Sequence, residues 1–229
     1  MKALLFHEHG TADVLKYEEI PDPTPNASEC IVRVQAAALN HLDIWVRRGW
    51  PGLKLDMPHV GGADGAGVVS AVGSNVTDVA EGMRVAICPG FATAEDEFTR
   101  RGEAPLSPSY RILGEHGQGT FAEYVAVPAS ALVEMPDDAS FSETAAAQLV
   151  YLTAWRMLVT RAQLQKDETV LLVGTGGGVN TAALQIAKHK GARVIALTSS
   201  EDKMTKAREL GADWVLDFTD LPPSPLMGS

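Results

Sequence analysis

A strand that enters a glycine-rich turn and continues into a helix constrains the fold of this chain most. The apolar run Thr169–Val173 ends at the turn 174–180, and a helical pattern follows at 182–190 and stops at Gly191. The alternation continues with a strand predicted at 193–197, a helix at 201–210 and a strand at 213–218. Strands that alternate with helices form a parallel sheet through right-handed crossovers. This part of the chain is therefore predicted to have an α/β fold.

The first part of the chain has a different pattern, with short β-branched runs separated by glycine and proline. These runs lie at 30–34, 67–73, 84–87 and 121–127. They predict a compact antiparallel β-barrel. A capping box at Ser140 and Glu143 opens a helix that is predicted to run to about Thr160. We therefore place one domain at 1–129 and a second at 130–229.

The glycine turn predicts a dinucleotide-binding site. Glycine lets the backbone approach a pyrophosphate, and the helix N-terminus offers N–H groups and the positive end of the helix dipole. The flanking strand and helix, and a second strand about 20 residues further on, strengthen the prediction. Where a third glycine usually packs the helix against the strand, this chain has Asn180, which is expected to tighten or tilt the helix start. The predicted cofactor contacts here are Gly174, Thr175, Gly176, Gly177, Gly178 and Val179.

The end of the second strand favours NADPH over NADH. An NAD enzyme would place Asp or Glu there to hold the ribose 2′-hydroxyl, and an acid would repel a 2′-phosphate. This chain has Thr198, Ser199 and Ser200 there, with Lys203 one turn further on. Hydroxyl groups and a lysine can instead donate hydrogen bonds to a 2′-phosphate. In the alternative interpretation, Ser199 caps the next helix and Lys203 is solvated, and both roles can hold together.

Composition excludes several classes of protein. The formal net charge of −10 argues against a nucleic-acid partner, because phosphate neutralisation needs clustered Lys and Arg. The only cysteines, Cys30 and Cys88, exclude a disulfide framework and favour a cytoplasmic setting. No segment approaches the ~20 apolar residues that a membrane span requires, and the N-terminal apolar run is too short for a signal peptide. The proline-rich residues 221–225 predict a loop or disordered tail.

Several stretches resemble the medium-chain dehydrogenase/reductase superfamily, which includes zinc-type alcohol dehydrogenases and quinone oxidoreductases. They lie at 40–43, 61–69, 73–76, 119–124, 153–155 and 199–203. The resemblance implies a GroES-like domain of substrate and catalytic residues, a Rossmann domain, and a nicotinamide cofactor between them. It also places Thr153 near the cofactor, although a helix hydroxyl that bonds its own backbone is the plain alternative.

The resemblance also implies that the Rossmann domain is partial. The family's sheet has six strands in the order 3-2-1-4-5-6, and this chain supplies the first three. The strand Thr169–Val173 would then have an unpaired apolar edge, which is an aggregation hazard. We expect a longer natural protein, whose full-length form is a homodimer or homotetramer as in many family members.

The catalytic zinc ligands of the family are replaced. Asn40 stands in place of the first cysteine, Ala63 in place of the histidine, and Leu149 in place of the third ligand. Leu42 replaces the hydroxyl that relays the alcohol proton. Zinc needs Cys or His ligands and an open position, so we predict a zinc-free protein with no metal ligands. A substitute metal site could be suggested at His41, Asp43, His59 and Asp64, but loop carboxylates and surface or core imidazoles explain these residues more simply.

This chain also lacks the four cysteines of the family's structural zinc lobe. The four positions are occupied by Thr93, Asp96, Thr99 and Ser107. Without thiolates to bind zinc, this segment is expected to be mobile.

These observations predict an NADPH-dependent reductase that transfers hydride to a small molecule, either a quinone or an α,β-unsaturated carbonyl. Without a Lewis acid, an unactivated alcohol is hard to oxidise, whereas a polarised acceptor needs only orientation and a hydrogen bond to the developing negative oxygen. Asn40 is the predicted polar contact and Tyr151 a candidate proton donor or stacking wall, although Tyr151 could equally be a core residue. The alternatives are a truncated, non-catalytic fragment that binds nucleotide weakly or not at all, and a zinc alcohol dehydrogenase.

Overall fold

The computed structural model of the chain describes residues 1–220, so the tail predicted at 221–225 lies outside the described residues. Contacts within the chain form two compact units, one from Met1 to Leu149 and one from Val150 onward. This division falls later than the predicted domain boundary after residue 129. The physical reason is that the strand Leu132–Glu134 pairs in the first unit's sheet and the helix Phe141–Ala146 packs against it.

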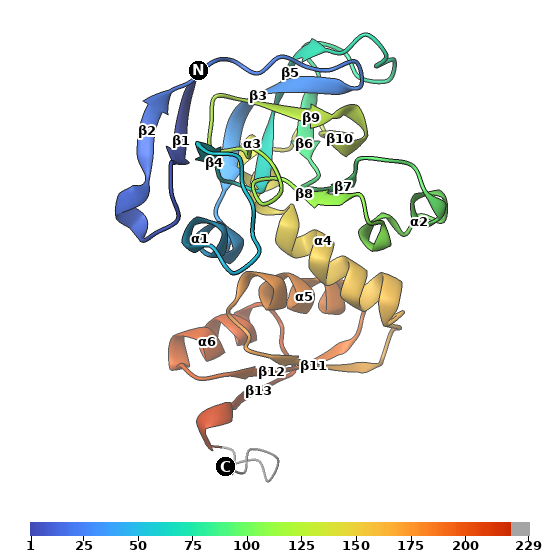
Figure 1. Cartoon of the computed structure of the whole chain (residues 1–229). Coiled ribbons are helices and arrows are strands. Elements are labelled where there is room, and N and C mark those ends of the chain that lie inside the picture. The colour runs from blue at the N-terminus through green and yellow to red at the C-terminus, as the bar shows by residue number, and fades with distance from the viewer. Residues whose placement is uncertain (221–229) are drawn as a thin grey trace. The chain divides into compact units, whose positions relative to one another are not determined.

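The first unit is built from antiparallel sheets (Figure 1). The strands are β1 (Lys2–Phe6), β2 (Lys16–Glu19), β3 (Glu29–Ala38), β4 (His59–Val60), β5 (Asp64–Val72), β6 (Arg84–Ile87), β7 (Gly90–Ala92), β8 (Tyr110–Ile112), β9 (Tyr124–Pro128) and β10 (Leu132–Glu134). One sheet has the order β10-β6-β5-β3-β9, a second β2-β1-β4, and a third is the β7-β8 pair. Within residues 1–220 these pairings give separate sheets, so the predicted barrel is present as antiparallel sheets without a closed ring of strands.

A buried apolar cluster holds the five-stranded sheet together. It contains Cys30, Val32, Val69, Val85, Ile87, Leu113, Val125 and Val127. The long strands β3 and β5 pair from Cys30 opposite Val72 to Ala38 opposite Asp64. This register sets the end of β3, and therefore Asn40, next to the start of β5. Helices α1 (His41–Arg48), α2 (Glu97–Arg100) and α3 (Phe141–Ala146) and short 3-10 turns at Ala12–Val14, Ala104–Leu106 and Ala129–Ala131 complete the unit.

The helix predicted from Ser140 to about Thr160 is interrupted. Ser140 caps α3 as predicted, since its side chain accepts a hydrogen bond from the Glu143 amide. α3 ends at Ala146, and a new helix, α4 (Leu149–Trp155), continues as a π-helix over Arg156–Arg161. The Leu149 amide donates to the Asp64 carboxylate at 2.9 Å. This long-range hydrogen bond caps the start of α4 and explains why the helix restarts there.

The second unit has the predicted parallel sheet. It is formed by β11 (Thr169–Val173), β12 (Arg193–Thr198) and β13 (Trp214–Asp217), in that order, followed by a short 3-10 turn at Phe218–Asp220. The crossover helices α5 (Gly178–His189) and α6 (Glu201–Glu209) lie on one side of this sheet (Figure 1). Their buried side belongs to an apolar cluster that includes Leu172, Leu184 and Val194.

β11 is an edge strand among the described residues, as the sequence predicted. Leu171 and Val173 on this strand are 54% and 65% exposed. None of the helices within residues 1–220 is long and apolar enough to cross a membrane.

Candidate functional site

The glycine turn connects β11 to α5. Gly177 is the N-cap of α5, so the next amides belong to the first turn of the helix and have no acceptor within it. The φ angles of Gly174 and Gly176 are +82° and +117°, a left-handed region that favours glycine. The amides of Gly174 and Thr175 both donate to the Leu197 carbonyl, at 3.0 and 2.8 Å. These bonds tie the turn to β12, and the turn presents a helix N-terminus without bulky side chains, which fits a pyrophosphate.

Three residues of the turn have roles that the sequence pattern did not reveal. The Asn180 amide nitrogen donates to the Val173 carbonyl at 2.6 Å, so this side chain joins the first turn of α5 to the end of β11. Gly178 makes a close approach to a helix rather than to a strand, since an added Cβ would lie 2.9 Å from Val150 Cγ1 on α4. The buried Thr175 hydroxyl donates to the Leu172 carbonyl, so its side chain serves the fold.

Lys203 lies over the glycine turn. A Cβ added at Gly176 would meet the Cδ and Cγ atoms of Lys203 at 2.9 and 3.1 Å. The aliphatic part of this lysine therefore packs against the turn. Lys203 and the predicted pyrophosphate contacts belong to one continuous surface of the second unit.

The end of β12 has no acidic residue at the positions predicted to select the nucleotide. Thr198 is buried, and Ser199 is exposed. The helix cap is Ser200 rather than Ser199: its hydroxyl accepts a hydrogen bond from the Lys203 amide at 3.4 Å. This corrects the alternative role predicted for Ser199. The reason is that Ser200 has extended backbone and stands directly before the first helical residue.

Asn40 is the N-cap of α1 and is held by two carboxylates. Its backbone amide donates to Asp43 Oδ2 at 2.6 Å, and its side-chain Nδ2 donates to Asp64 Oδ2 at 2.9 Å. Burial raises the pKa of Asp43, and hydrogen bonds from the amides of Asn40 and Gly62 oppose that rise. Asn40, the residue predicted to contact the substrate oxygen, is therefore held through both its backbone and its side chain.

Asp64 is the centre of this arrangement, and sequence reasoning gave it no such role. Its side chain is buried, with the residue 1% exposed. Besides Asn40, the carboxylate accepts from the Leu149 amide, and the Asp64 carbonyl accepts from the Thr120 hydroxyl at 2.7 Å. Burial raises the pKa of Asp64 to about 6, hydrogen bonds from Asn40 and Leu149 oppose the rise, and the charge of Asp43 adds to it.

The raised pKa of Asp64 predicts a specific pH dependence of stability. The folded protein binds this proton more tightly than the unfolded chain, so ionising Asp64 destabilises the fold as the pH rises from about 4 toward 6, with little further change above that. Relative to Asp64→Asn, the wild-type free energy of unfolding should fall by about 2 kcal/mol between about pH 4 and about pH 7. Denaturant titrations of both proteins at each pH measure this difference, and parallel stability curves would contradict the burial of a titrating carboxyl.

The residues at the family's catalytic zinc positions do not form a zinc donor set. Asn40, Ala63 and Leu149 supply no thiolate or imidazole, and the nearby Asp64 carboxylate is bonded to protein amides. The imidazole of His59 is buried and bonds the Gly114 carbonyl at 3.0 Å. Within residues 1–220 there is no group of three or more His, Cys, Asp or Glu side chains placed to hold a metal ion.

The segment that corresponds to the structural zinc lobe contains a network of hydrogen bonds, and its expected mobility stays a prediction. Asp96 Oδ1 accepts from the amides of Phe98 and Thr99, both at 2.9 Å, and Asp96 Oδ2 accepts from the Ser107 hydroxyl at 2.6 Å. The Thr99 hydroxyl accepts from the Asp96 amide at 2.8 Å. Three of the four positions that resemble the family's structural zinc ligands thus bond to one another.

The remaining predicted residues lie in the second unit, on α4. Tyr151 is partly buried and packs against the unit's apolar cluster, which agrees with its alternative role as a core residue. Thr153 is exposed. Asn40 belongs to the first unit, so a joint catalytic role for Asn40 and Tyr151 stays a prediction.

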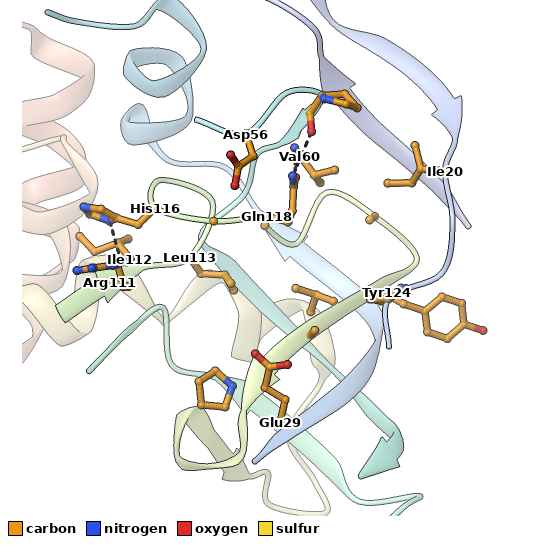
Figure 2. Close-up of a pocket in the computed structure, with 18 of the residues that line it drawn as sticks. Ile20, Glu29, Asp56, Val60, Arg111, Ile112, Leu113, His116, Gln118 and Tyr124 are labelled. Atoms are coloured by element: carbon orange, nitrogen blue, oxygen red, sulfur yellow. Dashed lines mark hydrogen bonds between the residues drawn. The ribbon is translucent and has the colours of Figure 1, made fainter. Parts of the chain in front are cut away.

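A separate cavity of about 710 Å³ lies in the first unit and contains none of the predicted site residues (Figure 2). Two of its polar side chains bond the protein's own backbone. Gln118 accepts from the Val60 amide and donates to the Pro58 carbonyl, and His116 Nδ1 accepts from the Ile112 amide. These contacts shape the loop before β9, and we assign the cavity no role in the chemistry.

Comparisons with known proteins agree with this architecture. Residues 26–137 match the alcohol dehydrogenase GroES-like domain family, and residues 178–224 match the zinc-binding dehydrogenase family. A zinc-type alcohol dehydrogenase-like protein of Schizosaccharomyces pombe is 36% identical over 92% of this chain and 60% of its own length. A crotonyl-CoA carboxylase/reductase of Cereibacter sphaeroides is 33% identical over 95% of this chain and 53% of its own length.

A solved structure of an NAD-dependent alcohol dehydrogenase is 47% identical, with a TM-score of 0.91 over 96% of this chain and 64% of that one. The chain thus spans about 60% of the length of the curated relative from S. pombe. Both halves of the chain match in the family's order, and the relatives are dehydrogenases and reductases. The chain therefore belongs to the medium-chain dehydrogenase/reductase superfamily, with a GroES-like domain followed by part of a Rossmann domain.

Proposed function

We propose that this protein is an NADPH-dependent, zinc-independent reductase that transfers hydride to a quinone or an α,β-unsaturated carbonyl compound. The observation that carries the proposal is the Asp64 carboxylate, which bonds Asn40 and Leu149 at two of the three positions where the family's zinc enzymes have ligands. Hydrogen bonds among protein groups at these positions support chemistry without a metal ion. An acceptor that needs no Lewis acid fits this arrangement.

The nucleotide preference is supported by the end of β12. The hydroxyl groups of Ser199 and Ser200, and Lys203 across the turn, offer donors for a 2′-phosphate without an opposing carboxylate at that position. The amides at the start of α5 would hold the pyrophosphate. The bound nicotinamide supplies the hydride, and the protein supplies orientation and electrostatics.

Asn40 supports reduction of a polarised acceptor. One Nδ2 proton is donated to Asp64, and the second can be donated to the oxygen on which negative charge develops. The crotonyl-CoA carboxylase/reductase among the relatives is consistent with this chemistry, because crotonyl-CoA is an α,β-unsaturated thioester. For the full-length protein we propose a homodimer or homotetramer.

The test is a turnover assay on protein dialysed against a chelator. We expect NADPH oxidation with 1,4-benzoquinone or 2-cyclohexenone, and no ethanol oxidation with NADP⁺ or NAD⁺. Stoichiometric zinc by metal analysis, or ethanol oxidation that the chelator abolishes, would favour an alcohol dehydrogenase instead. No nucleotide binding at millimolar NADPH would favour a non-catalytic fragment.

Lys203 gives a selective prediction. Replacing Lys203 by alanine should raise the Kd for NADPH about tenfold while changing the Kd for NADH by less than about twofold, because only NADPH has the 2′-phosphate. The matched control is Lys206→Ala, which removes an exposed lysine from the last turn of the same helix. Fluorescence titrations of all variants measure both constants. Equal weakening of NADPH and NADH would place Lys203 at the shared pyrophosphate instead.

A further inference from the structure

Asp64 and Asn40 are brought together by the fold although 24 positions separate them. Asn40 lies two residues after the end of β3, and Asp64 begins β5, which pairs with β3. The carboxylate is buried, and its two oxygens accept from different elements: Oδ2 from the Asn40 side chain and Oδ1 from the Leu149 amide. The Thr120 hydroxyl donates to the main-chain carbonyl of the same residue and does not contact the carboxylate.

We propose that Asp64 is a positioning residue that fixes the orientation of the Asn40 amide. A carboxylate only accepts hydrogen bonds, so it selects the NH₂ end of the amide over the oxygen end. The amide group is planar, so fixing one N–H also fixes the direction of the other. The proposal deepens the proposed function and rests on it, since the second N–H is the donor offered to the acceptor oxygen.

The bond to Leu149 makes this orientation specific. With Oδ1 held by the Leu149 amide, the carboxylate cannot rotate freely toward another partner. An asparagine at position 64 has the same shape but only one acceptor oxygen. It can therefore satisfy either Leu149 or Asn40, and its NH₂ group would face the other donor.

The experiment is a double-mutant cycle between Asp64→Asn and Asn40→Ala, with Thr120→Val as the matched control. Thr120→Val removes a buried hydrogen bond to the same residue but leaves the carboxylate bonds in place. With NADPH and 2-cyclohexenone, Asp64→Asn should lower kcat at least about tenfold with KM for NADPH within about twofold. In the Asn40→Ala background the same substitution should change kcat by less than about twofold. Thr120→Val should leave kcat within about twofold of wild type.

A second readout does not depend on turnover. The side-chain NH₂ resonances of Asn40 are identified in a nitrogen–proton NMR spectrum by their loss in Asn40→Ala. In the wild type and in Thr120→Val, one of these protons should be protected from solvent exchange, and Asp64→Asn should remove that protection. Equal kcat losses from Asp64→Asn in both backgrounds, or unchanged protection in Asp64→Asn, would overturn the proposal. If the wild type reduces neither acceptor, the proposed function fails, and the NMR readout alone decides whether Asp64 positions Asn40.

Discussion

Replacing Gly119 by alanine is expected to lower the free energy of unfolding of the first unit by about 3 kcal/mol. A Cβ at this position would lie 2.3 Å from the carbonyl oxygens of both Gly61 and Gly62, which real Cβ atoms cannot approach so closely. The amides of Gly119, Thr120 and Phe121 donate to the carbonyls of Val60, Gly62 and Gly61. The backbone must therefore separate and weaken these hydrogen bonds.

Gly117 provides the matched control for this prediction. It lies in the same loop, and a Cβ added there would meet no atom within 4 Å. Gly117→Ala should change the stability by less than about 0.5 kcal/mol in denaturant titrations. Equal losses of stability from the two substitutions would contradict the close contact of this loop with residues 61 and 62.

Replacing Gly176 by alanine is expected to weaken NADPH binding at least about tenfold while lowering stability by only about 1–2 kcal/mol. The φ angle of +117° is strained for alanine, and the new Cβ would lie 2.9 Å from Lys203 Cδ. The lysine must move and the turn must change shape, and both are proposed to contact the nucleotide. Isothermal titration with NADPH and thermal unfolding separate the two effects.

Gly211 separates backbone strain from the effect on the site. Its φ angle is +95°, and an added Cβ would make only ordinary contact, at 3.7 Å, with Lys188. Gly211→Ala should therefore lose similar stability and bind NADPH with the wild-type Kd. Comparable losses of affinity in both variants would show that strain in the second unit, rather than the glycine turn, controls binding.

The second unit was largely predictable because its signals are local. The glycine turn, the stop at Gly191 and the apolar run of β11 each lie within a few residues of the elements that they define. The family resemblance and the fold class were confirmed. The N-cap of α6 is Ser200, one residue after the predicted Ser199, because two adjacent serines give the same local signal.

The first unit was less predictable because its organisation depends on contacts between distant residues. The interruption before α4 is stabilised by Asp64, 85 positions away from Leu149. The hydrogen bond between Ser107 and Asp96 joins residues that no short motif connects. The sheet β2-β1-β4 was also missed, since β4 has only two residues, His59 and Val60, and forms through pairing with β1. Whether the predicted site residues act as proposed stays a prediction.

A nicotinamide nucleotide is proposed to bind at the glycine turn of the second unit. The most direct measurement is a titration of the isotope-labelled protein with NADPH, followed through its backbone amide resonances. We expect saturable shifts concentrated at Gly176, Gly178, Val179 and Lys203. Saturable binding that shifts other amides and leaves these unchanged, or no shift at millimolar NADPH, would contradict the claim.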